Sequence, residues 1–177
     1  MSETSATGTV VSQKLKRKAL VHYLDAMFNE TGTYWYKIGK HVEDMSIELN
    51  PSLDSFTNIL DETAVEDNGY EPSTDVDTYY ADPADGVFYT KLKDITMNRL
   101  TDDDCKTTIL EVLIDGTSSS YDAWTEDVIV KPQSYGGATG GVRIPYSITF
   151  CGNRQYGTVA FSSKTPVFTA STSDSEY

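Results

Sequence analysis

Reactive side chains are scarce in this sequence, which has only two cysteines and two histidines in 177 residues. Cys105 follows three aspartates and Cys151 closes an apolar segment, so nothing pairs them and we expect free thiols, as in a reducing compartment such as the cytosol. His22 and His41 lie outside any nucleophile motif such as Gly-x-Ser-x-Gly. The sequence therefore predicts neither a hydrolase nor a zinc site, and we expect no enzyme and no cofactor.

Long apolar runs and basic residues are also few. No segment has the length and apolarity of a membrane span or of a secretory signal, and we expect neither. Lys and Arg total 14 against 27 acids, a formal net charge of −13. Because nucleic acid phosphates are bound by clusters of Lys and Arg, a chain this acidic is not expected to grip DNA.

The basic residues that do occur are concentrated near the N-terminus. Residues 1–20 have a net charge of +3, which leaves −16 for the remainder of the chain. We interpret residues 1–18 as a flexible basic arm that solubilises the protein or contacts another subunit, in preference to a nuclear signal or a lipid-binding patch. Residues 171–177 are predicted to be a polar C-terminal tail, so 19–170 form the folded domain. The arm's cations are Lys14, Lys16, Arg17 and Lys18.

Acids dominate the next distinctive segment, because no Lys or Arg occurs from Asp61 to Thr90. Residues 61–80 are predicted to be a long exposed acidic loop or a loose hairpin. Two acidic groups, Asp75 with Asp77 and residues 102–104, have the oxygen ligands that calcium prefers. The spacing of an EF-hand is absent, so a solvated acidic loop is the favoured interpretation and no metal site is predicted.

Hydrophobic periodicity predicts many strands and one helix. Alternation indicates strands at 45–49 and 142–150, the latter at a sheet edge or with a bulge because Pro145 has no N–H to donate. A segment apolar on both faces, 107–114, reads as a buried strand. Asp82 and Pro83 predict a helix start, with Phe88, Leu92 and Ile95 on one face. Further strands are expected at 34–38, 52–60, 121–131, 156–161 and 166–169; residues 19–28 fit a helix or a strand equally well.

Two other features have ordinary explanations. The glycine-rich segment 136–141 is not followed by the Gly-Lys-Ser/Thr of a phosphate loop, so a hairpin loop is favoured. Aromatic residues such as Trp35 and the pair Tyr79/Tyr80 have the flat faces that stack on sugars or bases. Core and subunit-interface packing is the preferred interpretation of them.

An ordered series of short motifs resembles the major tail protein, or tail tube protein, of long-tailed bacteriophages, notably those of Gram-positive hosts. The resemblance spans roughly residues 34–168, and no single motif in it is specific. Its motifs are Tyr36-Lys37-Ile38-Gly39-Lys40, Met45-Ser46-Ile47-Glu48-Leu49-Asn50-Pro51, Gly69-Tyr70-Glu71-Pro72-Ser73, Tyr79-Tyr80-Ala81-Asp82, Tyr121-Asp122-Ala123-Trp124, Gln133-Ser134-Tyr135-Gly136-Gly137, Ile144-Pro145-Tyr146, Gly152-Asn153-Arg154 and Gly157-Thr158-Val159.

This resemblance implies a mainly β fold, a β-sandwich of two packed, mostly antiparallel sheets with one flanking α-helix. It also implies hexameric rings that stack into a tube in the virion tail, after assembly in the bacterial cytoplasm. The implied partners are other copies of the chain, a tape measure protein, a tail terminator and distal tail proteins. DNA would pass through the lumen without specific binding, since six copies at −13 give a formal −78 per ring.

Acids on the expected strands are the lumen candidates: Asp44, Glu48, Glu126 and Asp127. Because side chains alternate along a strand, Glu126 and Asp127 are not expected to face the lumen together. The basic arm and the acidic segment have opposite charge, so we expect them to meet across stacked rings. The inter-ring candidates are Lys14, Lys16, Arg17, Lys18, Glu66, Asp67, Glu71, Asp75 and Asp77.

Two alternatives remain open from the sequence. A sugar-binding β-sandwich of a virion or cell surface would also explain the aromatics, the acidity and the lack of catalytic motifs. A tube subunit of a contractile tail, or of a phage-derived bacteriocin, would carry the same signals.

Overall fold

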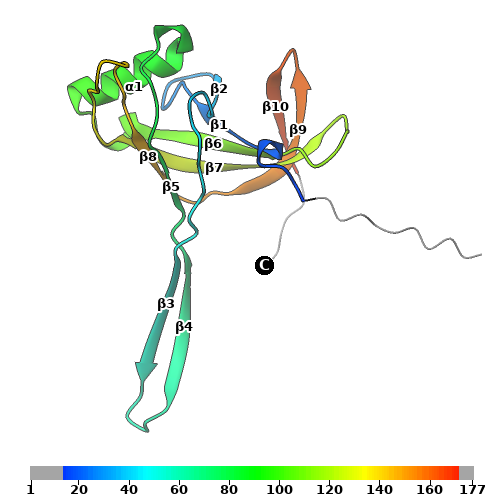
Figure 1. Ribbon diagram of the computed structural model, residues 1–177. Coiled ribbons are helices and arrows are strands. Elements are labelled where there is room, and N and C mark those ends of the chain that lie inside the picture. Colours follow the sequence, from blue (N-terminus) through cyan, green and yellow to red (C-terminus); the bar gives the residue numbers. More distant parts are fainter. Residues whose placement is uncertain (1–13, 172–177) are drawn as a thin grey trace, which may run out of the picture.

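The computed structural model describes residues 14–171, and its strands form one eight-stranded sheet and one separate two-stranded sheet (Figure 1). The strands are β1 (Leu20–Asp25), β2 (Trp35–Lys37), β3 (Pro51–Thr57), β4 (Thr63–Tyr70), β5 (Ser73–Val76), β6 (Lys106–Leu113), β7 (Tyr121–Pro132), β8 (Tyr146–Phe150), β9 (Gln155–Ser162) and β10 (Thr165–Ala170). The helices are α1 (Val87–Asn98) and three short 3₁₀ turns, η1 (Arg17–Ala19), η2 (Pro83–Asp85) and η3 (Asp102–Cys105).

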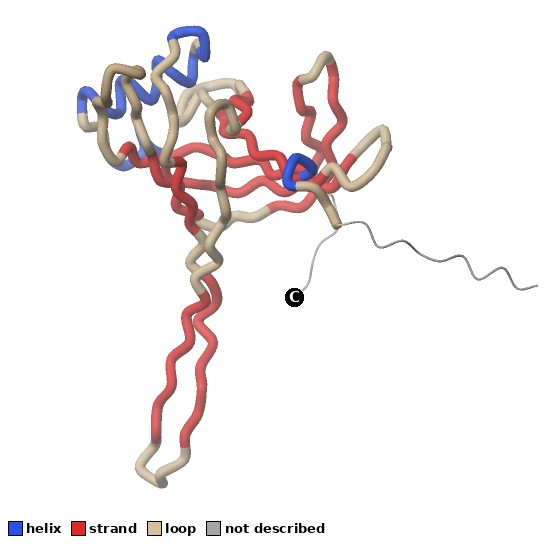
Figure 2. Tube along the Cα trace, in the orientation of Figure 1, coloured by secondary structure: helices blue, strands red, loops and turns tan. Residues whose placement is uncertain are grey.

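The long strand β7 organises the larger sheet. One edge of β7 pairs with the whole of β6 through residues 122–129, while its other edge is divided between two strands. Residues 121–125 pair with β9 and residues 128–132 pair with β8, all antiparallel. Beyond this division the sheet continues as β9–β10 on one side and as β8–β5 on the other. Figure 2 shows the two groups of strands diverging from the central strands, with the helix on the β8 side.

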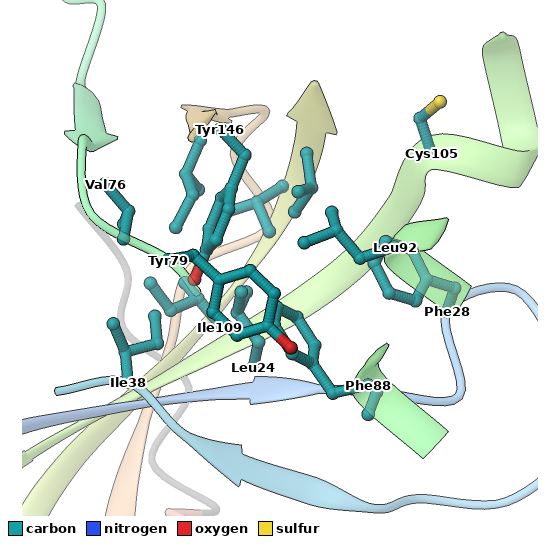
Figure 3. Packing of buried hydrophobic residues seen from close by; sticks show 14 of the residues in the cluster. Leu24, Phe28, Ile38, Val76, Tyr79, Phe88, Leu92, Cys105, Ile109 and Tyr146 are labelled. Atoms are coloured by element: carbon teal, nitrogen blue, oxygen red, sulfur yellow. The ribbon is translucent and has the colours of Figure 1, made fainter. Parts of the chain in front are cut away.

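The main hydrophobic core lies between the central strands and the β5–β8–α1 layer. Leu24, Ile109 and Val128 are fully buried here, and α1 contributes Phe88 and Leu92. Figure 3 shows Leu24, Leu92 and Ile109 packed around the rings of Tyr79, Phe88 and Tyr146. The rings of Tyr36 and Phe88 stack with their centroids 3.9 Å apart, and those of Tyr79 and Tyr146 meet the Phe88 ring edge-on. Tyr79, Phe88 and Tyr146 are thus core residues and Tyr36 packs against them, whereas other aromatic side chains, such as Phe56 and Tyr156, are exposed.

A second core lies on the opposite face of the central strands. Val21, Leu110, Val112 and Ala123 pack there against Val159 of β9. Because β6 is covered on both faces, segment 107–114 is mostly apolar instead of alternating. The predicted class, mainly β with packed layers of antiparallel strands and one flanking helix, is confirmed.

The predicted helix signals are also found. The Asp82 side chain accepts a hydrogen bond from the Ala84 N–H at 2.9 Å and caps η2, after which Gly86, at φ 61°, redirects the chain into α1. Phe88, Leu92 and Ile95 are the buried face of α1, as the periodicity predicted. Segment 19–28, for which helix and strand were both open, contains β1. Within residues 14–171, no helix is long and apolar enough to cross a membrane.

Two strand predictions were wrong in part. Residues 45–49 are extended and Met45 is buried, but they form only a single bridge, from Glu48 to Ser73. Two backbone carbonyls of this segment accept hydrogen bonds from side chains and not from a neighbouring strand. Arg17 donates to the Met45 carbonyl, and Thr74 donates to the Ser46 carbonyl. The 142–150 strand begins only at Tyr146 and pairs on both sides, so Pro145 lies just before a central strand and not at an edge.

Residues 61–80, expected to be a long loop or a loose hairpin, contain two strands. Their first half is β4, which pairs with β3 into a ribbon that projects from the body of the protein (Figure 1), and their second half includes β5. Of the basic arm, residues 14–18 are described and lead into η1, while 1–13 lie outside the described residues. Of the C-terminal tail, only Ser171 is described.

Gly157 tests how tightly β9–β10 closes on the second core. A Cβ at this position would lie 2.2 Å from the Thr169 carbonyl oxygen and 2.7 Å from the Phe168 ring. We expect Gly157→Ala to destabilise the protein by ~1–3 kcal/mol, as overpacking does, in urea denaturation. Gly140→Ala is the matched control, because a Cβ there has no neighbour within 4 Å. Equal midpoints for the two variants would contradict this packing.

Candidate functional site

The chain turns a corner where the two halves of β7 diverge, and this corner gathers the buried charges of the protein. Between β8 and β9, Gly152 and Asn153 both adopt left-handed backbone conformations, at φ 90° and 56°. Glycine and asparagine are the residues that accept this conformation most readily. Backbone hydrogen bonds join Asp127 to Cys151 and Gly152, at 2.8 and 3.1 Å, so the corner is fixed to the middle of β7.

Arg154, the residue after the corner, bridges two buried glutamates from neighbouring strands. Its guanidinium lies 2.7 Å from a Glu111 carboxylate oxygen and 2.8 Å from one of Glu126. Both glutamate side chains are 8% exposed, whereas Arg154 is 46% exposed and also lies over the Trp124 ring. Two carboxylates therefore share one guanidinium at the boundary between interior and solvent.

His22 on β1 completes this cluster, which we call the corner cluster: His22, Glu111, Glu126 and Arg154. Its Nε2 is 3.5 Å from a Glu111 oxygen and has no hydrogen-bond partner within the described structure. Burial alone would raise the pKa of Glu111, but the contact with His22 and the charge of Arg154 outweigh it, so this pKa is lowered. Glu111 is thus held ionised.

The corner cluster forms the floor of a broad groove of about 1260 Å³. One wall comes from residues 45–49 and 70–72, at the base of the β3–β4 ribbon, and includes Ile47, Leu49 and Tyr70. The other side is formed by Arg17, Leu20 and the corner residues 149–152. The lining is mostly apolar above a charged floor. Arg17 keeps its guanidinium on two backbone carbonyls, those of Leu20 and Met45.

The β3–β4 ribbon is the most exposed element of the fold. Its register places Asp54 opposite Glu66 on one side of the ribbon and Leu53 opposite Asp67 on the other. Like charges directly opposite each other disfavour pairing. Neither side of the ribbon is buried. Its large exposed apolar side chains are Leu53, Phe56, Ile59, Leu60, Val65 and Tyr70.

The structure separates the four lumen candidates into two groups. Asp44 and Glu48 line a shallow depression together with Asp75 and Asp77, two of the inter-ring candidates. Glu126 is buried in the corner cluster. Asp127 is exposed on the other side of β7 and accepts a hydrogen bond from Asn153 at 3.0 Å.

The remaining inter-ring candidates lie on three elements. Glu66 and Asp67 are on the ribbon and Glu71 is at its base, all exposed. Lys14, Lys16 and Lys18 are exposed just before β1, next to the engaged Arg17. Among the described residues, no ion pair within one copy joins these lysines to the ribbon acids.

Reasoning from the sequence missed Arg154, His22 and Glu111. One signal was available: Glu111 is a single charge inside the otherwise apolar segment 107–114, and buried charges need partners. The partners come from β1 and from the corner, more than 40 residues away on either side along the chain. Among residues 14–171, no three His, Cys, Asp or Glu side chains are grouped as ligands for a metal ion.

Comparison with known proteins supports the fold. No protein-family model and no curated protein matches the chain. The anti-feeding prophage cap, a tube-terminating cap, superimposes with a TM-score of 0.51 at 12% identity, covering 87% of this chain and 97% of that one. The sheath/tube terminator of an extracellular contractile injection system, PVC, in its extended state gives 0.48 at 9% identity, over 83% and 99%. The likeness to the tube-terminating cap shows a shared fold.

The corner cluster predicts how stability depends on pH. The pKa of Glu111 is lowered in the folded state, so its contribution is present above its ordinary pKa and is lost as pH falls through the lowered value. We expect the melting temperature of the wild type to fall on acidification below about pH 4, with a shallower fall for Glu111→Gln. The exposed Asp104→Asn is the control. Parallel pH profiles for wild type and Glu111→Gln would contradict the assignment.

Proposed function

We propose that this chain is a structural subunit of a phage-tail-like tube, in which copies associate as rings and the rings stack. The observation that carries this proposal is the projecting β3–β4 ribbon (Figure 2). It presents exposed apolar side chains on a two-stranded sheet that is apart from the eight-stranded one.

Such a ribbon is expected to gain stability when another surface covers it. An isolated two-stranded hairpin is at best marginally stable in water, and this one also opposes Asp54 to Glu66. Packing its apolar side chains against a neighbouring molecule removes them from water and adds stability. In a self-assembling protein, that neighbour is another copy of the same chain.

Charge suggests which part of the neighbour the ribbon meets. Residues 51–70 contain five acids and no Lys or Arg. The exposed cations Lys14, Lys16 and Lys18 form the complementary surface, so contact between the ribbon of one ring and the basic segment of the next follows the expected arm-to-acid pairing. Opposite charges of this kind steer association and fix its register more than they add affinity.

The shared fold favours a second role within the same kind of assembly. The match to the tube-terminating cap covers 97% of that chain. A ring that ends a tube is therefore the alternative to a ring that builds the tube wall. The two roles differ in polymerisation. A wall subunit stacks without limit, whereas a cap stops at one ring. The length of the particles formed by the pure protein therefore separates them.

For a tube wall, the acidic depression of Asp44, Glu48, Asp75 and Asp77 is the strongest lumen candidate. These four exposed acids, repeated in every copy, would repel the phosphate backbone, so DNA would pass without being held. Glu126 is buried and shares Arg154 with Glu111, so it adds little to this field.

Shortening the ribbon tests the assembly. Replacing residues 54–67 with an Asn-Gly turn keeps a short hairpin at the base and removes the exposed apolar tip. We expect this variant to keep the wild-type melting temperature but to form no tubes by negative-stain electron microscopy. The full-length control Ser55→Thr should assemble like the wild type. Tubes of normal length from the shortened variant would reject the proposed contact.

Reversing the acids of the depression tests the lumen. Asp75→Lys with Asp77→Lys is expected to leave tubes intact and to slow DNA ejection from particles that carry the variant, because cations retard the phosphate backbone. The delay should shrink as salt rises, since screening weakens the contact. Asp104→Lys, an exposed acid on η3, is the control. Ejection at the wild-type rate would remove the depression from the lumen.

A further inference from the structure

The groove above the corner cluster is too large and too open for a small ligand. Its volume of about 1260 Å³ exceeds the ~300–1,000 Å³ typical of small-molecule pockets. Its apolar side includes Leu49 and Tyr70, which are more than half exposed in the isolated chain. These features fit a segment of another protein.

The charge of the floor specifies part of that segment. Glu111 and Glu126 carry two negative charges, while Arg154 supplies one positive charge between them. The remaining lining acid, Glu71, and the lining cation Arg17 offset each other, so the groove keeps a net formal charge of −1. Partly buried carboxylates that share one guanidinium are stabilised by a further cation. The fitting occupant is therefore apolar with one positive charge.

One exposed element of this chain has that composition, the β9–β10 ribbon. Lys164 is the only charged residue in 155–170 and lies at the turn, where Ser163 and Lys164 both adopt left-handed conformations, at φ 49° and 69°. The exposed apolar side chains Phe161 and Val167 flank this tip. In Figure 1 the ribbon extends from the central strands on the side opposite β3–β4, and Lys164 does not line the groove of its own copy.

We propose that the tip of the β9–β10 ribbon in one copy docks in the groove of a second copy, with Lys164 against the Glu111–Glu126 carboxylates. The contact joins two different surfaces, so it repeats from copy to copy and closes a ring or continues a filament according to its rotation. It deepens the proposed function by naming a contact between copies, and it is distinct from the ribbon contact made by β3–β4.

A disulfide between two kinds of subunit tests the contact, because the free Cys151 is exposed and lines the groove. A tagged Lys164→Cys/Cys151→Ser protein is mixed with untagged wild type under mild oxidation. Partial desolvation and the nearby Asp127 charge raise the pKa of the Cys151 thiol, so the reaction is run at mildly alkaline pH. The proposal expects a tagged–untagged dimer. Thr117→Cys/Cys151→Ser, with its cysteine in an exposed loop, is the matched control and should give little of it.

Two results would overturn the contact. One is a mixture that yields only tagged–tagged dimers, and the other is as much tagged–untagged dimer from the control as from the Lys164→Cys/Cys151→Ser protein. Charge substitutions at Lys164 test the contact independently. Lys164→Glu should weaken association by about tenfold or more in sedimentation, since like charges at an interface oppose binding, while Lys164→Arg should retain it. Wild-type rings or tubes without the mixed dimer would reject this contact and leave the proposed function. A wild type that stays monomeric at every concentration would reject both.

Discussion

The sharing of one edge of β7 between two strands is the constraint on which the rest of the structure depends. β9 and β8 leave this edge in different directions, and each carries its own layer across one face of the central strands. The division creates two cores and leaves a corner that must cross between them. The chain crosses at Gly152 and Asn153, where left-handed conformations and hydrogen bonds to Asp127 hold it in place.

This constraint also explains where the buried charge lies. At the division, Glu126 has no strand neighbour on that edge, and the sheet face around it is not fully covered by either layer. Arg154 emerges from the corner at this point and reaches both Glu126 and Glu111. The opening between the layers therefore becomes a groove with a charged floor. An apolar floor at the same place would expose a large hydrophobic patch to water.

Much of the fold could be predicted from local patterns. The apolar faces of α1 and of β8, and the doubly buried β6, are properties of consecutive residues and were found from their spacing. Segment 45–49 could not be placed in the same way. Its alternation is real, but the groups that satisfy its backbone are side chains of Arg17 and Thr74, which a strand pattern does not reveal. The candidate site was harder still, since His22, Glu111 and Arg154 meet only through the pairing of distant strands. The predicted lumen pair Glu126 and Asp127 do lie on opposite sides of β7, as alternation required.

The β3–β4 ribbon forms a sheet of its own, and this separates two properties that are usually measured together. Its side chains contribute little to the two cores, so ordinary substitutions along it leave the folding of the body unchanged. A mutational survey scored by solubility or thermal stability would rank these positions among the most tolerant in the chain. Such positions are selected for contacts between molecules and not for stability of the single chain. Only a survey scored by assembly of the completed particle would identify them.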